Sequence, residues 1–218
     1  MKKIKIFALF TLSAGLIALP AAGCENPAEG KTKAKTSKAR AISNAPLSGK
    51  QVETIALTPS NTRIHWKGSK VTGSHEGQFT AFRGTIQAAD ANPRKARIRL
   101  TIDMSSVTSD NAKLTGHLKS KDFFWVKKHP EATFVSTSIV PNTKKGASHT
   151  ITGNLTLRGV TRSITFPASL RITDSHVKAT SEFWIDRHQW NINYKGMKDD
   201  LIRKEVVLKL AINAKRAR

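Results

Sequence analysis

Apolar and polar residues alternate with a period of two along most of the chain beyond residue 60. This alternation is typical of β-strands that bury one face. The clearest example has Ala96, Ile98, Leu100 and Ile102 separated by basic residues and a threonine. Segments that keep one parity, or are rich in β-forming residues, predict about eight antiparallel strands. They lie at 64–66, 78–89, 95–102, 132–140, 150–157, 164–172, 177–185 and 206–212.

This pattern predicts an all-β domain with one or two short helical insertions. Antiparallel strands with one apolar face form either a sandwich or a closed barrel, and alternation alone does not separate the two. An eight-stranded barrel is just wide enough to hold one slender ligand. Helical turns are expected at 109–121, where Leu114 and Leu118 share a face, and near 187–194.

One strand needs a break in its parity. Phe79 and Phe82 cannot both face the core from an unbroken strand over 78–89. A β-bulge at Gly77 or Gly84 is therefore expected.

The N-terminus is typical of an exported protein. Three lysines within residues 2–5 precede an apolar run over 6–19, which is shorter than the roughly 20 residues of a membrane-spanning helix. The run ends in LPAAGC, which resembles a bacterial lipobox with Cys24 as the lipidated residue. The alternative is ordinary cleavage that leaves Cys24 as a free thiol. Because Cys24 is the only cysteine, lipidation would also remove an unpaired thiol from an exported protein.

These features divide the chain into a signal peptide at 1–23, a tether at 24–50, a folded domain at 51–214 and a basic tail at 215–218. The tether is rich in Lys, Ala, Ser and Thr and lacks apolar periodicity, so it is expected to be disordered. The formal net charge is +22. Export argues against nucleic acid as the partner and leaves anionic lipid, an envelope polymer or a merely solvated surface.

Two blocks of residues resemble the signature of the YceI-like family. Residues 117–124 read HLKSKDFF and are followed by TFVSTSI at 133–139. Residues 151–161 read ITGNLTLRGVT, with TFP at 165–167. Weaker matches are FWIDR at 183–187 and GSHEGQF at 73–79. Arg158, Trp125 and Trp190 depart from the family pattern, which has histidine, aspartate and phenylalanine there.

The resemblance implies an exported, eight-stranded, lipocalin-like barrel that binds a polyisoprenoid or fatty-acyl lipid in its lumen, on the periplasmic face of a membrane. Leu118, Phe123 and Trp190 are expected to close one end, and His117 to bind a head group or cap a turn. The expected lumen wall consists of Phe79, Phe82, Ile86, Ile98, Leu100, Ile102, Phe134, Leu155, Phe166 and Phe183.

Catalytic and metal sites receive little support. The seven histidines are scattered, without ligand spacing or a partnering cysteine, so no metal site and no cofactor are expected. The chain also lacks a nucleophile elbow, a phosphate-binding loop and an HExxH motif. Two hypotheses remain: a membrane-anchored lipid-binding protein, or a structural lipoprotein with a packed barrel and a basic binding surface.

Overall fold

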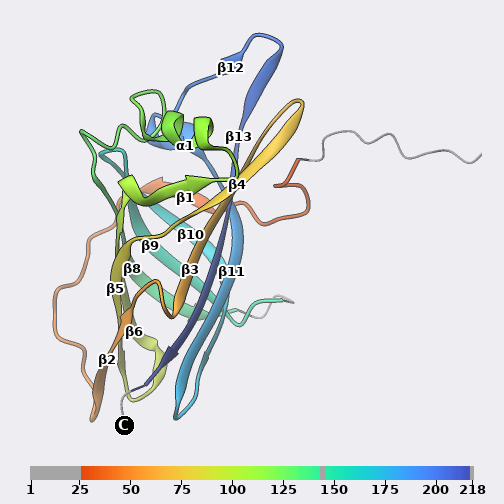
Figure 1. The fold of residues 1–218 in the computed structure, drawn as a ribbon. Coiled ribbons are helices and arrows are strands. Elements are labelled where there is room, and N and C mark those ends of the chain that lie inside the picture. The colour runs from red at the N-terminus through yellow and green to blue at the C-terminus, as the bar shows by residue number, and fades with distance from the viewer. Residues whose placement is uncertain (1–25, 143–145, 217–218) are drawn as a thin grey trace, which may run out of the picture.

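The computed structural model describes residues 26–142 and 146–216, and these residues form one curled antiparallel sheet with a single α-helix (Figure 1). The helix α1 spans Ala112–Lys119, and two 3₁₀ turns, η1 and η2, span Met104–Ser106 and Arg187–Trp190. The thirteen strands are β1 (Lys35–Lys38), β2 (Val52–Leu57), β3 (Thr62–Lys70), β4 (Gly73–Phe79), β5 (Phe82–Ala89), β6 (Asn92–Asp103), β7 (Val107–Ser109), β8 (Glu131–Pro141), β9 (His149–Leu157), β10 (Val160–Ile172), β11 (His176–Asp186), β12 (Gly196–Met197) and β13 (Asp200–Lys215).

The strands follow the order β2-β5-β6-β8-β9-β10-β11-β13-β3-β4-β7, with β1 and β12 attached to the side of this path. The last long strand, β13, lies between β11 and β3, so the C-terminal strand pairs with a strand from the first part of the domain. The path ends at β2 and β7, and no ladder joins these two strands within the described residues. The architecture is therefore a curled sheet of lipocalin type, and the predicted count of eight strands is wrong.

The extra strands have local causes. The segment predicted as one strand over 78–89 is two strands, β4 and β5, because the pairing is interrupted at Thr80 and Ala81: β4 pairs with β3 and β7, whereas β5 pairs with β2 and β6. This interruption, rather than a bulge, lets both Phe79 and Phe82 be buried. Gly77 has another function: a Cβ there would overlap the carbonyl oxygen of Thr108, so glycine permits β4 and β7 to pair closely.

The inward face of the sheet carries the core, as the alternation predicts. The helix α1 lies across one end of the curled sheet (Figure 1). It begins where the Asn111 side chain accepts a hydrogen bond from the backbone nitrogen of Leu114 at 3.0 Å, which caps its first turn. Leu118 of α1 is buried against the core. Among the described residues, no helix has the length and apolar character needed to cross a membrane.

The segment predicted to be a disordered tether belongs in part to the sheet. Strand β1 pairs with Arg162–Thr165 of β10, whereas β11 pairs with β10 only at Ser169–Ile172. On the other side of the segment, the nitrogen of Ala34 donates to the oxygen of Trp184 at 2.9 Å. Residues 32–38 thus fill the space where β10 and β11 diverge. This pairing joins positions about 130 residues apart, so periodicity within the segment could not reveal it.

The tail predicted at 215–218 is also partly ordered. Lys215 is the last residue of β13, and the Nε of Arg216 donates to the Oε2 of Glu53 at 2.8 Å. This ion pair fastens β2 near the end of β13. Residues 217 and 218, the predicted signal peptide at 1–23 and Cys24 lie outside the described residues.

We expect Ala34→Asp to destabilise the fold, because Ala34 is fully buried in the core. An unpaired carboxylate there should lower the free energy of unfolding by about 3–5 kcal/mol. Urea unfolding, followed by circular dichroism, measures this change. Ala45→Asp places the same charge on an exposed residue of the same segment and should change stability by less than about 0.5 kcal/mol. Equal midpoints for Ala34→Asp and the parent protein would show that residues 32–38 do not belong to the folded sheet.

Candidate functional site

A cavity of about 420 Å³ runs inside the curled sheet. Its wall is almost entirely apolar and is built from inward residues of β3, β6, β8, β9, β10, β11 and β13, with α1 at one end. Voids in packed protein cores are rarely larger than a water molecule. Sites for small ligands occupy about 300–1,000 Å³. The volume and lining therefore match a ligand site better than a packing defect.

Several large side chains border this space without being fully buried. Phe134, Leu155 and Leu210 line the cavity and remain only partly buried although they point into the sheet. Leu208 and Ile212 do the same on β13. Their remaining accessible surface faces room that no other side chain fills, which is the surface an apolar ligand would cover.

An aromatic row forms one side of the cavity. The rings of Phe166 and Phe183 stack with centroids 4.2 Å apart, and Phe134 packs against Phe166 at 5.9 Å. A Cβ on Gly153 would overlap the ring of Phe134, so glycine makes room for this ring on the inner face of β9. The glycine of the ITGNLTL motif is therefore needed so that the Phe134 ring can pack in the cavity wall.

Eleven of the fourteen predicted ligand-binding residues line the cavity. They are Phe79, Ile86, Ile98, Leu100, Ile102, Leu118, Phe123, Phe134, Leu155, Phe166 and Phe183. Phe82, Trp190 and His117 do not line it. Phe82 is buried beside Ile102 across the β5–β6 ladder. Trp190 is completely buried, and its Nε1 donates to the oxygen of Leu155 at 3.2 Å, so its role is packing at the cavity's end.

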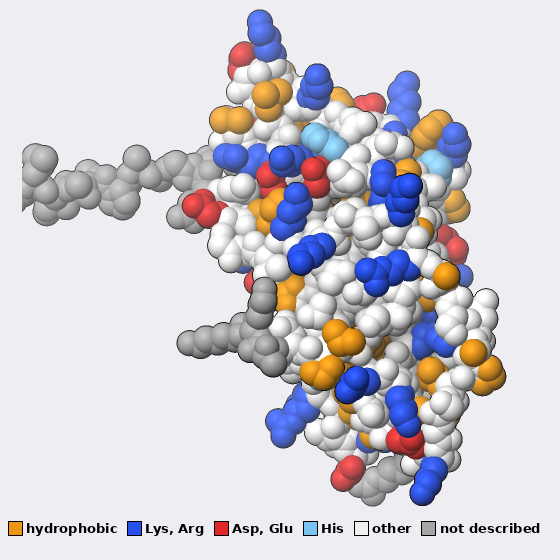
Figure 2. Space-filling model, turned by 180° about the vertical axis from the view of Figure 1, so that it is seen from behind, with side chains coloured by type: hydrophobic (Ala, Val, Ile, Leu, Met, Phe, Trp, Pro, Cys, Tyr) orange, Lys and Arg blue, Asp and Glu red, His pale blue; other side chains and the backbone are white. Residues whose placement is uncertain are grey.

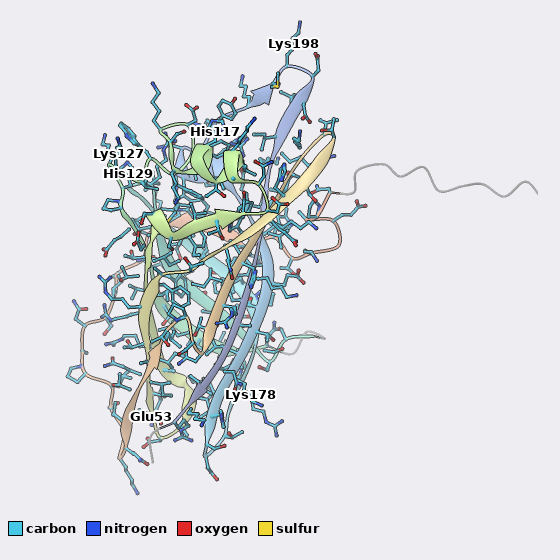
Figure 3. The ribbon with its side chains drawn as sticks, in the orientation of Figure 1. Glu53, His117, Lys127, His129, Lys178 and Lys198 are labelled. Carbon is cyan, nitrogen blue, oxygen red and sulfur yellow. The ribbon has the colours of Figure 1, made fainter. Side chains whose placement is uncertain are left out.

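His117 is placed beside the cavity rather than in it. It lies on α1 (Figure 3), and its Nε2 is 3.0 Å from Oδ2 of Asp122. Its ring also packs edge-on against Phe123 and Tyr194, at centroid distances of 4.9 and 4.8 Å. His117 therefore fixes the loop after α1, and this loop presents Phe123 and Phe124 to the cavity.

Arg158 helps to hold the same end of the molecule together. It sits in the β9–β10 turn with a φ of +49°, and the following Gly159 has a φ of +74°. Its guanidinium donates to the backbone oxygens of Asn191 and Lys121, which lie just after η2 and just before Asp122. Arginine, where the family pattern has histidine, therefore ties two loops at the cavity's end to the β9–β10 turn.

A set of basic residues lines the cavity and was missed by the sequence analysis. Lys70, His75, Arg187 and Arg203 border it, and among the described lining residues none is acidic. Lys70 and His75 lie at alternate positions of β3 and β4 that face inward with Trp66 and Phe79. Their parity is visible in the sequence, but alternation alone predicts an apolar wall and gives no reason to expect basic side chains in it.

Arg187 is a buried structural cation. It is 4% exposed, and its guanidinium donates to the oxygens of Ile192, Tyr194, Ile202 and Arg203, at 2.5 to 3.1 Å. Burial lowers the pKa of Arg187, and the neighbouring Asp186 carboxylate opposes that change. The hydrogen bonds to carbonyls account for all three guanidinium nitrogens, so Arg187 organises the chain between η2 and β13.

Lys70 and Asp200 fasten the β3–β4 hairpin to β13. The Nζ of Lys70 donates to the Asp200 carboxylate, and Thr72 donates to the same group from its backbone nitrogen and its hydroxyl. The hydrogen bond from Lys70 is the main reason that the pKa of Asp200 lies below its usual range, and Thr72 adds to it. This carboxylate therefore stays ionised at neutral pH and holds the tip of the hairpin.

Within the described parts of the chain, no three His, Cys, Asp or Glu side chains gather in the way a metal ion requires. The site is an apolar cavity with a few hydrogen-bond donors in its wall. It offers burial and hydrogen bonding to a bound molecule, and its lining holds no carboxylate or thiol.

Comparison with known proteins agrees with this geometry. The family model described as "YceI-like domain" matches residues 56–214. A UPF0312 protein of Pectobacterium atrosepticum is 42% identical over 94 residues, which are 43% of this chain and 47% of that protein. The protein YceI of Salmonella arizonae is 43% identical over 94 residues, covering 43% and 48%. The chain thus aligns with about half the length of the curated relatives it matches.

Solved structures share the fold at lower sequence identity. Burkholderia cenocepacia BcnA has a TM-score of 0.62 and 23% identity over 72% of this chain and 99% of its own. A polyisoprenoid binding domain from Saccharophagus degradans has a TM-score of 0.58 and 13% identity over 77% and 100%. The family match covers well over half of the residues, and the curled sheet is the one these structures have. The chain belongs to the YceI-like domain family.

Proposed function

We propose that this protein binds one long apolar molecule, of polyisoprenoid or fatty-acyl type, in the cavity of its curled sheet. The observation that carries the proposal is the cavity itself, about 420 Å³ with an almost wholly apolar wall. The solved domain from Saccharophagus degradans, which has the same fold, is described as polyisoprenoid binding. Storage, transport or protection of such a lipid would all require this binding step.

The energetics favour a long ligand over a short one. Each methylene moved from water into an apolar site contributes about 0.8 kcal/mol. A chain with ten buried methylenes therefore gains about 8 kcal/mol, from which the cost of association must be subtracted. A short alkyl chain does not gain enough to offset that cost. We propose binding as the function and assign no chemical step to the cavity.

Titration of the lipid-free protein with hexadecan-1-ol tests the proposal. Trp66 lines the cavity, so its fluorescence emission should shift as the alcohol enters. A saturable change at one alcohol per protein is expected, with no change for butan-1-ol at the same concentrations. No saturable signal with either alcohol, and no bound alcohol after gel filtration, would contradict the proposal.

The alternative function, that of a structural lipoprotein with a basic binding surface, is suggested by the net charge. The net charge is +22, and Figure 2 shows Lys and Arg side chains spread over the whole of one face rather than gathered in one patch. Such a surface is attracted to anionic lipid head groups or envelope polymers. The alternative also supposes a packed barrel, and the apolar cavity favours the lipid-binding hypothesis instead. The basic surface suits a protein that works beside an anionic membrane.

We propose further that the protein is exported and anchored through Cys24. Only Glu25 separates Cys24 from the first described residue, Asn26, and Ala28 is already buried against the fold. A lipid on Cys24 would therefore hold the sheet close to the membrane rather than on a long tether. This arrangement would bring the cavity near its apolar ligand.

Cys24→Ser should release the protein from membranes, because two or three acyl chains anchor far more firmly than one or none. Detergent phase separation of cell envelopes measures the change: the parent protein should enter the detergent phase and the variant the aqueous phase. Ser43→Ala, an exposed change in the same N-terminal region, should leave partitioning unchanged. Parent protein found in the aqueous phase would contradict the anchor.

A further inference from the structure

One polar region of the cavity wall lies where β3 meets β13. Three buried polar atoms have no hydrogen-bond partner among the described residues and belong to residues that line the cavity: Trp66 Nε1, Ser69 Oγ and Arg203 Nε. Trp66 is 9% exposed and Ser69 is 5% exposed. Buried donors in folded proteins nearly always have partners, because each has lost its hydrogen bonds to water. All three atoms are closed off from the empty cavity by surrounding atoms, so they mark a polar part of its wall that a ligand reaches only if the covering side chains move.

A register shift brings Arg203 to this place. Ile202 pairs with Lys70 and Val206 pairs with Gly68. Three residues of β13, 203–205, therefore lie opposite the single residue Ser69 of β3. Such a bulge interrupts the alternation locally, so that a residue out of phase with Ile202 and Val206 can also face the cavity. Arg203 therefore lines the cavity together with Ile202 on one side and Val206 on the other.

The charges around Arg203 leave it uncompensated. Lys70 is paired with Asp200, and His75 hydrogen-bonds Asp110 at 2.9 Å. Arg187 donates to the backbone oxygen of Arg203, so its buried guanidinium lies beside the backbone of this residue. None of the described lining residues is acidic. Arg203 is therefore a cation in the cavity wall without an ion-pair partner among the described residues, and this favours an anion beside it.

We propose that the ligand of this cavity is an amphiphile with an anionic oxygen head group, a carboxylate or a phosphate. The oxygens of the head group accept from the terminal nitrogens of the Arg203 guanidinium, and the apolar chain extends along the aromatic row of Phe134, Phe166 and Phe183. An ionised carboxylate or phosphate monoester offers mainly acceptors, so it matches a site whose free groups are donors. This inference rests on the proposed lipid binding and names the class of lipid.

The test compares three ligands with the same chain. Hexadecanoate, hexadecyl phosphate and hexadecan-1-ol are titrated below their aggregation concentrations into the full, lipid-free protein. The parent protein should bind hexadecanoate or hexadecyl phosphate, or both, at least about tenfold more tightly than the alcohol, since charge-assisted hydrogen bonds are the stronger ones. The anion bound more tightly tells whether the site fits a carboxylate or a phosphate. Inorganic phosphate alone should not compete, because it has no chain.

Arg203→Gln should reduce this preference to less than about threefold and leave the affinity for the alcohol unchanged. Arg203→Lys keeps the charge and should restore most of the preference, which distinguishes loss of charge from a damaged fold. Lys204→Gln removes an exposed neighbouring charge and should behave like the parent protein. Equal affinity of the parent protein for the alcohol and both anions, or a preference that survives in Arg203→Gln, would overturn the head-group assignment. Failure of all three ligands to bind would overturn the proposed function as well.

Discussion

Replacing Leu210 by tryptophan should abolish the binding of a long apolar chain while the sheet stays folded. Leu210 lines the cavity from β13, opposite Ser181 of β11 and Ile64 of β3, and is only partly buried. An indole at this position extends into the open space. If it displaces about four methylenes of the ligand, about 3 kcal/mol of binding free energy is lost. That loss corresponds to an affinity more than about 100-fold weaker.

Lys209→Trp is the matched control. Lys209 is the preceding residue of β13 and is exposed on the opposite side of the strand. The same indole placed there should leave the affinity for radiolabelled hexadecan-1-ol within about twofold of the parent value, a change of less than about 0.5 kcal/mol. Equilibrium dialysis measures both variants, and circular dichroism shows that both are folded. Undiminished binding by a folded Leu210→Trp variant would place the ligand outside this cavity.

Phe183→Ala and Phe134→Ala should differ in their effect on stability, although both rings line the cavity. Phe183 is 1% exposed and stacks on Phe166, so its removal should lower the free energy of unfolding by about 3–5 kcal/mol, as in a packed core. Phe134 is only partly buried and already borders open space. Its removal should cost about 1–2 kcal/mol.

Urea unfolding of the lipid-free variants measures these costs. Adding hexadecan-1-ol should then stabilise Phe134→Ala, because a ligand that binds only the folded state raises its stability by mass action. Phe82→Ala is a useful comparison, since Phe82 is buried in the core without lining the cavity. A full core-sized cost for Phe134→Ala, unchanged by added alcohol, would indicate a packed barrel without a ligand.

The inward faces of the main strands could be predicted from the sequence because alternation is a local property. Ile98, Leu100 and Ile102 keep one parity along β6, and the pleat of a strand puts such residues on one face. The same reasoning placed Leu155 on β9 and Phe166 on β10 in the cavity wall. A single strand's parity does not depend on its neighbours, so these assignments needed no knowledge of topology.

Features that depend on distant partners could not be predicted in this way. The residues of β1 show no alternation, and they are ordered because β10 and β11 diverge and leave their edges free for pairing. Arg203 enters the cavity because of the register shift opposite Gly68 and Lys70, which only the paired strands reveal. His117 was singled out by its motif, but its partner Asp122 made it a structural residue beside the cavity.

Native mass spectrometry of the full protein after incubation with a long-chain polyprenol or hexadecanoate tests the central claim most directly. Lipid binding in the cavity predicts a complex with one lipid per protein, which survives gel filtration and is absent for Leu210→Trp. Lys209→Trp should form the complex as the parent protein does. Only lipid-free protein after incubation with either compound, or a complex that Leu210→Trp forms equally well, would contradict the claim that this cavity holds the ligand.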